Sequence, residues 1–109
     1  MPLYIVTGCY TQQAAKGMIE NPSDREAAAA AIIKAAGGTQ KAFYITTGET
    51  DWMSISEFAD GVDMLPVGLV TAASGAVSNV KTIRAYSPAE FTNAQEKAAK
   101  IASAYKPPR

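Results

Sequence analysis

Residues 43–58 constrain the fold more than any other part of the chain. They read FYITTGETDWMSISEF, which is two strand-like runs joined by a short turn that contains glycine and acidic residues. Pairing the runs places apolar side chains on both faces of the hairpin: Phe43, Ile45 and Trp52 on one, and Tyr44, Met53 and Ile55 on the other. An antiparallel sheet in contact with water has one polar face. We therefore expect an α+β fold that buries its second sheet face against another subunit, because so short a chain cannot cover both.

Length and composition indicate one domain and argue against nucleic-acid binding, an intrachain disulfide and a membrane span. A length of 109 residues suits one domain, which we expect to span residues 1–109. Ten basic and ten acidic residues cancel, and this balance disfavours nucleic acid as a partner. The one cysteine, Cys9, cannot form an intrachain disulfide, and no apolar run reaches the roughly 20 residues of a membrane span. These features predict a cytoplasmic protein with no membrane partner.

The chain alternates strand and helix patterns. We expect strands within residues 3–10, 39–47, 51–58 and 77–86, and helices at 23–36, from about 60 to 74, and at 87–105. Residues 11–20 read as a loop with one helical turn, and residues 106–109 as a frayed tail. This βαββαβ order with an added C-terminal helix is the ferredoxin-like arrangement. Right-handed crossovers then place the two main helices on one sheet face and leave the other open.

Local signals predict how each helix begins. Ser23 and Glu26 match a capping box, as do Ser87 and Glu90. Either Asp60 or Asp63 would cap the middle helix. That helix should carry Pro66 in its first turn and face the sheet with four side chains: Leu65, Leu69, Val70 and Ala73. The first helix should bury an apolar stripe formed by Ala28, Ala29, Ile32, Ile33 and Ala36.

Three segments together resemble a known family. YIVTGCYT at residues 4–11, GGTQKAFYITTGETDW at 37–52 and VKTIRAYSPAEF at 80–91 are similar to the GYD-domain proteins, small bacterial and archaeal proteins named after a Gly-x-Tyr-Asp turn. Gly48 and Asp51 match that turn, whereas Thr50 stands where the family has tyrosine. The resemblance implies a dimeric α/β-barrel fold, in which two open sheets pack face to face, and it implies no particular reaction.

The residues offer little for catalysis. Histidine is absent, which excludes Ser-His-Asp and Cys-His chemistry and, with one cysteine, a structural zinc site. No glycine pattern matches a nucleotide-binding loop, so we expect neither a metal nor a cofactor. Glu49 and Asp51 could act as a carboxylate pair, but turn chemistry is the stronger interpretation, with Asp51 accepting backbone N–H groups.

Arg84 is the first candidate for a ligand contact. A guanidinium within the fourth strand needs a partner, which could be a small anionic ligand, a carboxylate such as Glu57 or Asp51, or a carboxylate of a second subunit. Pairing within the protein is the favoured interpretation. The other candidates, by their place on the strands, are Tyr4, Thr7, Tyr44 and Asp51. Tyr4, Thr7 and Tyr44, together with Trp52, could line a pocket between sheet and helices.

Two functions remain open from the sequence. The favoured one is a homo-oligomeric binding or structural module built by sheet-to-sheet packing. The alternative is a small enzyme of the dimeric α/β-barrel type, with a pocket beside the sheet. In the enzyme, Arg84 would bind an anionic organic substrate, Asp51 or Glu57 would move protons, and Tyr4 or Tyr44 would orient the substrate. This alternative rests on fold analogy alone.

Overall fold

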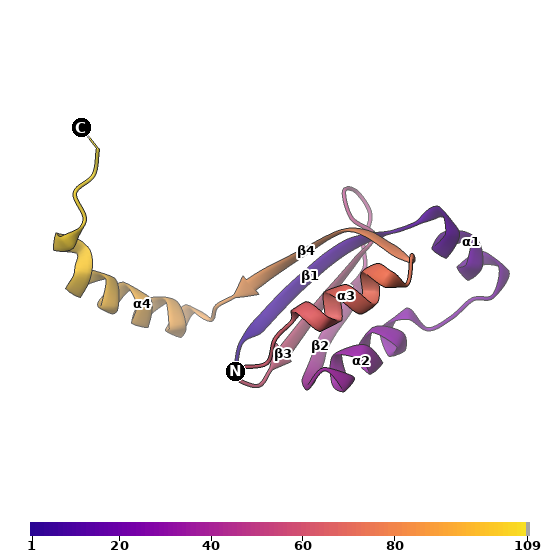
Figure 1. The fold of residues 1–109 in the computed structure, drawn as a ribbon, viewed down its shortest axis with the longest axis horizontal. Helices are drawn as coiled ribbons and strands as arrows, with labels where there is room; N and C mark the ends of the chain where they lie inside the picture. Colours follow the sequence, from indigo (N-terminus) through magenta and orange to yellow (C-terminus); the bar gives the residue numbers. More distant parts are fainter. Residues whose placement is uncertain (109) are drawn as a thin grey trace.

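The computed structural model describes residues 1–108, and within them the chain adopts an α+β fold (Figure 1). The strands are β1 (Leu3–Tyr10), β2 (Gly38–Ile45), β3 (Trp52–Phe58) and β4 (Val77–Ala85). The helices are α1 (Gln12–Glu20), α2 (Arg25–Ala35), α3 (Leu65–Ala73) and α4 (Pro88–Ile101), and a 3-10 turn, η1 (Ala102–Ala104), follows α4. The strands form one sheet in the order β2-β3-β1-β4 with every neighbouring pair antiparallel.

The two faces of the sheet differ in what covers them. Helices α2 and α3 lie over the same face (Figure 1), where they line one cavity together with side chains of all four strands. Neither α2 nor α3 covers the opposite face. The hairpin register confirms the predicted division of its side chains, because Ile45 pairs with Trp52 and Tyr44 pairs with Met53. The prediction that the chain leaves one sheet face open is therefore confirmed.

Two glycines let aromatic side chains pack directly on the backbone. A Cβ at Gly8 would lie 2.4 Å from Cζ2 of Trp52, and one at Gly38 would lie 2.6 Å from Cε1 of Phe58. Trp52 and Phe58 are two of the few buried apolar residues, and Ile33 of α2 is a third. The core therefore lies between α2 and the centre of the sheet, and it depends on side chains that fit where no Cβ is present.

Residues 11–20 fold differently from the expected loop. They form α1, because the Thr11 hydroxyl accepts a hydrogen bond from Ala14 N at 3.2 Å and so caps a nine-residue helix. The capping box predicted at Ser23 is also wrong. Asp24 caps α2 by accepting from Ala27 N at 3.1 Å, while the Ser23 hydroxyl accepts from Arg25 Nη1.

The orientation of α3 also differs from the prediction. The helix begins at Leu65 and has Pro66 in its first turn as expected. The predicted cap is wrong, because the N-cap is Met64 and no side chain caps the helix, although Asp63 Oδ1 accepts from Leu65 N at 2.9 Å. From this start, Val67 and Thr71 turn towards the sheet. Leu65 and Leu69, predicted to face the sheet, are instead 65% and 62% exposed.

Helix α4 leaves the rest of the molecule. It projects from the end of β4 away from the sheet (Figure 1), and its residues are all exposed. The radius of gyration of 17.7 Å exceeds the roughly 13 Å of a compact domain of this length. The capping box of Ser87 and Glu90 is confirmed. Residues 106–108 of the predicted tail form neither helix nor strand, and residue 109 lies outside the described residues.

Candidate functional site

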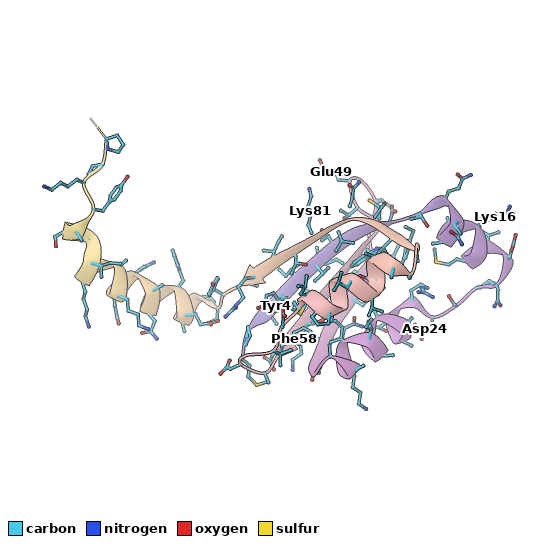
Figure 2. All side chains as sticks on the ribbon, viewed as in Figure 1. Tyr4, Lys16, Asp24, Glu49, Phe58 and Lys81 are labelled. Carbon is cyan, nitrogen blue, oxygen red and sulfur yellow. The ribbon has the colours of Figure 1, made fainter. Side chains whose placement is uncertain are left out.

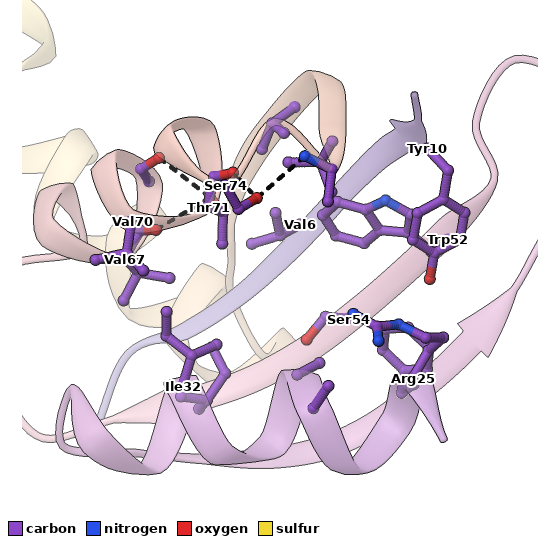
Figure 3. A pocket seen from close by; sticks show the side chains of 18 of the residues that line it. Val6, Tyr10, Arg25, Ile32, Trp52, Ser54, Val67, Val70, Thr71 and Ser74 are labelled. Carbon is purple, nitrogen blue, oxygen red and sulfur yellow. Dashed lines mark hydrogen bonds between the residues drawn. The ribbon is translucent and has the colours of Figure 1, made fainter. Parts of the chain in front are cut away.

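A cavity of about 270 Å³ lies between α2, α3 and the covered face of the sheet. Figure 3 shows it from close by, with α3 above and α2 below. Apolar side chains from both helices and from the strands form most of its wall: Val6, Ile32, Phe43, Val67, Val70 and Val80. The apolar stripe predicted on α2 contributes four of its five members, Ala28, Ala29, Ile32 and Ile33, to this lining.

Polar groups gather at one end of the cavity. Tyr10, Arg25, Trp52 and Ser54 lie together there, away from the end formed by Ile32 and the valines of α3 (Figure 3). The Ser54 hydroxyl already has partners, since it donates to Gln40 Oε1 at 3.0 Å and lies 3.2 Å from the Ser56 hydroxyl. Ser54 and Ser56 can therefore be buried on the covered face of β3, because their hydroxyls have hydrogen-bond partners.

Two buried nitrogens at this end have no hydrogen-bond partner within residues 1–108. They are Nε1 of Trp52 and Nε of Arg25. Trp52 as a whole is only 9% exposed. Nη1 of Arg25 donates to the Ser23 hydroxyl at 3.1 Å, so Ser23 holds the far edge of the guanidinium. Buried polar groups are nearly always paired in folded proteins, which makes these two donors the most unusual feature of the site.

Among the described residues, 1–108, Arg25 is the only charged one that lines this cavity. None of the ion pairs found among the described residues includes it. The cavity therefore has one positive charge in an otherwise uncharged and largely apolar wall, while Nε of Arg25 and Nε1 of Trp52 are covered by surrounding atoms.

Arg84 lies outside this cavity, near Tyr4 on the same covered face of the sheet. Its guanidinium stacks 4.3 Å from the centre of the Tyr86 ring and lies 5.9 Å from that of Tyr4. It donates to the carbonyl of Ala85 and lies 3.6 Å from the carboxylate of Glu90. Glu57 and Asp51, the two carboxylates predicted to pair with Arg84, do not pair with it.

The reason is where those carboxylates lie. Glu57 is 3.9 Å from Lys41, because bulged β2 places that lysine beside it. Asp51 sits at the opposite end of β1, where Oδ2 accepts from Tyr10 N at 2.9 Å. Its own N–H donates to the carbonyl of Gly8 at 2.8 Å. Asp51 thus accepts a backbone N–H, as its structural interpretation predicted, and it ties the hairpin turn to β1.

Thr7 and Tyr44 lie on the uncovered face, whereas Tyr4 lies on the covered face with Arg84. Thr7 is opposite Met53, which in turn is opposite Tyr44, and Tyr44 is 59% exposed. Figure 2 shows Tyr4 beside Phe58, with Glu49 far from both at the tip of the hairpin. The five predicted ligand contacts therefore occupy three separate places. Of the four aromatic and hydroxyl residues expected to line a pocket, Trp52 alone lines the cavity.

Arg25 is the residue that sequence reasoning missed. It precedes the apolar stripe of α2 by three and four residues, at Ala28 and Ala29, and by seven and eight at Ile32 and Ile33. Residues at this spacing share one face of a helix. The periodicity therefore placed Arg25 on the buried side, but its position within an apparent capping motif drew attention to Ser23 instead.

Comparison of the sequence with known protein families shows which family the chain belongs to. The sequence profile of the GYD domain matches residues 4–94. The chain belongs to the GYD domain family. In this GYD-domain protein, Gly48, which the resemblance placed in the hairpin turn, has a φ of 102°. The hydroxyl of Thr50, in the same turn, lies 3.3 Å from that of Thr46. No match was found among curated proteins or among solved structures.

No group of three or more cysteine, aspartate or glutamate side chains within residues 1–108 could hold a metal ion. No helix in the same range has both the length and the apolar character needed to cross a bilayer.

Proposed function

We propose that this GYD-domain protein is a homo-oligomeric, cytoplasmic binding or structural module in which the uncovered sheet faces of two copies pack together. One observation carries the proposal: the uncovered face is largely apolar although neither of the helices that pack on the sheet shields it. Its side chains follow from the strand register and are Leu3, Ile5, Thr7, Thr39, Ala42, Tyr44, Met53, Ile55, Glu57, Lys81, Ile83 and Ala85.

The apolar side chains of this face form a continuous row. Ile5 lies directly between Ile55 and Ile83, and Ile55 continues to Ala42 of β2. Ile83 is 52% exposed. Contiguous exposed apolar surface of this kind marks an interaction site. Charged side chains, Lys41 with Glu57 and Lys81, stand around the row and would form the polar rim of an interface.

A second copy of the chain is the occupant that fits best. A sheet face can pack on an identical face about a two-fold axis, and two-fold dimers are the commonest soluble assemblies. The strand order β2-β3-β1-β4, with α2 and α3 on one side, supports a ferredoxin-like arrangement. The family resemblance supports pairing of such sheets in a dimeric α/β barrel.

Helix α4 supports the same assembly. Isolated helices shorter than about 12–15 residues are marginal in water, and α4 has 14 residues without a cover. Its apolar side chains recur on one side, at Phe91, Ala94, Ala98 and Ile101. An arm of this kind gains stability if it packs on a neighbouring copy, and two copies can exchange arms symmetrically.

Native mass spectrometry of the wild-type protein and of Tyr44→Lys tests the proposal. We expect the wild type to have the mass of two copies or a multiple of two. Tyr44→Lys places a charge in the proposed interface and should yield monomers without unfolding the chain, since the side chain is exposed in a single copy. Ile19→Lys in α1, also at an exposed apolar position, is the matched control and should keep the wild-type mass. A monomeric wild type contradicts the proposal.

The enzyme alternative receives less support from the geometry. Its groups do not converge, because Asp51 binds the backbone at Tyr10 whereas Tyr4 lies six residues away along β1. At about 3.3 Å per residue this separation is roughly 20 Å. Arg84, which would bind the substrate, is engaged by Glu90 and Tyr86 and does not line the cavity.

A further inference from the structure

We propose that α4 of one copy docks on a second copy, in the groove that the cavity forms between α2 and α3. The side of α4 that faces the groove is its apolar stripe, which consists of Phe91, Ala94, Ala98 and Ile101. The inference rests on the proposed homo-oligomer and names the surface that receives its arm. This groove lies on the helical side of the sheet, whereas the proposed sheet-to-sheet contact uses the uncovered side, so each contact can be tested separately.

The cavity is open to solvent, and its apolar wall is exposed in a single copy. Val70 of α3 and Val80 of β4 line it, yet they are 56% and 40% exposed. Beyond its polar end the wall is mainly aliphatic (Figure 3). Contiguous apolar surface that remains exposed marks an interaction site. The groove therefore calls for an apolar occupant.

Helix α3, which forms one side of the groove, is apolar all round. Residues 64–80 contain no charged side chain. Val67 and Thr71 turn towards the sheet. On the other side of the helix, Leu65 and Leu69 are 65% and 62% exposed. Helices that are apolar all round are normally buried, so α3 itself lacks a cover in a single copy.

Gly68 in the middle of α3 leaves room for a closely packed neighbour. It lines the groove, and a Cβ added there would meet no neighbouring atom within 4 Å among the described residues. Glycine inside a helix lowers stability relative to alanine and usually has a packing reason. Aromatic rings of this chain already pack on Gly8 and Gly38. Phe91 of an incoming α4 can approach the α3 backbone in the same way at Gly68.

Helix α4 matches the groove in length and in charge. Its 14 residues span about 21 Å, compared with about 14 Å for the nine residues of α3 and about 17 Å for the eleven of α2. The charged residues of α4 lie outside its apolar stripe. Docking of the stripe therefore brings no charge into the largely apolar groove, where an unpaired charge would be costly.

The contacts at the start of α4 direct the arm to a second copy. The helix projects away from the sheet of its own copy (Figure 1). Glu90 forms the capping box with Ser87 and lies 3.6 Å from Arg84 of β4, and these contacts help to fix the direction of the helix. If two copies exchange arms, each apolar stripe and each groove gains a cover, as in domain swapping.

Paramagnetic relaxation enhancement between two chains tests the docking. Both chains carry Cys9→Ser. One is unlabelled and carries Glu96→Cys with a nitroxide spin label, on the side of α4 away from the stripe, and the other is labelled with ¹⁵N. In the equilibrated mixture, amide signals of the groove should broaden, among them those of Ala29, Gly68 and Thr71. No broadening there, or broadening confined to the uncovered sheet face, overturns the inference.

Two leucine variants of the ¹⁵N-labelled chain form a matched pair. Gly68→Leu fills the groove, whereas Gly17→Leu places the same side chain on α1. Neither added Cβ would meet a neighbouring atom within 4 Å among the described residues, so both variants should fold. Gly68→Leu should abolish the broadening of the groove signals and Gly17→Leu should retain it. Equal broadening in the two variants overturns the assignment of the groove.

Two further samples separate the alternatives. A chain that carries both the spin label and ¹⁵N, diluted with unlabelled protein, reports contact of an arm with its own groove, and groove broadening in that sample alone overturns the exchange. A wild type with the native mass of two copies but without groove broadening refutes this inference alone. Groove broadening together with an unchanged mass of Tyr44→Lys supports the arm contact and refutes the sheet-to-sheet packing.

Discussion

The guanidinium of Arg84 and the carboxylate of Glu90 lie 3.6 Å apart and join the last strand to the helix that leaves the body. The same carboxylate accepts a hydrogen bond from Ser87 N at 2.9 Å, and the Ser87 hydroxyl accepts from Glu90 N at 3.1 Å. Glu90 therefore both caps α4 and contacts β4. This double role helps set the direction in which the arm extends.

Acid should loosen the start of α4. The backbone hydrogen bond from Ser87, followed by smaller contributions that include the charge of Arg84, holds the pKa of Glu90 below its usual range. A lowered folded-state pKa means that the stabilisation is present above the unfolded-state pKa and is lost as pH falls through the folded-state value. The Ser87 amide proton should titrate by NMR with a midpoint below that of an ordinary glutamate. In Glu90→Gln that titration should vanish, and a midpoint at or above the ordinary value contradicts the contact.

The arm itself can be tested by charge on its two sides. Phe91→Asp places a carboxylate in the apolar stripe of α4, whereas Asn93→Asp places one about 200° around the same helix. If α4 packs on a neighbouring copy, Phe91→Asp should lower the dimer affinity by about tenfold or more, and Asn93→Asp should have little effect. Sedimentation equilibrium measures both affinities. Equal affinities would show that the stripe is not part of the interface.

The hairpin was predictable because strand alternation has a strict period of two. Tyr44 and Met53 could be assigned to one face and Ile45 and Trp52 to the other from the sequence, and the register agrees. The capping box of Ser87 and Glu90 was equally predictable, because its partners are three residues apart. Features determined by neighbours in the sequence were thus accessible without a structure.

Features determined by tertiary contact could not be predicted from the sequence. Which side of α3 faces the sheet depends on how the helix docks, since Val67 and Thr71 line the cavity while Leu65 and Leu69 are exposed. The partner of Arg84 depends on the path of the chain after β4, which brings Glu90 to it. The cavity and its unpaired nitrogens depend on how closely α2, α3 and the sheet approach, which no local pattern encodes.

Gly8 should be required for the packing of Trp52. In Gly8→Ala the new methyl group would overlap the indole ring, so the ring or the strand must move, and overpacking of this kind costs about 1–3 kcal/mol. Gly17→Ala is the matched control, because nothing lies within 4 Å of its added Cβ in α1. It should stabilise the protein by about 0.5–1 kcal/mol. Urea unfolding gives both values, and equal stability of the two variants would contradict the close approach.

Asp51 should stabilise the fold rather than act as an isolated turn residue. Asp51→Ala removes the acceptor of the Tyr10 N–H and should lower the free energy of unfolding by about 1–3 kcal/mol, as expected when a partly buried donor loses its partner. Asp51→Asn retains a carbonyl acceptor and should lose less. Glu49→Ala, two residues away and exposed, should stay within about 0.5 kcal/mol of the wild type. If urea unfolding gives Asp51→Ala the stability of Glu49→Ala, the link between hairpin turn and β1 contributes nothing to folding, and the matching aspartate of the family turn would need another explanation.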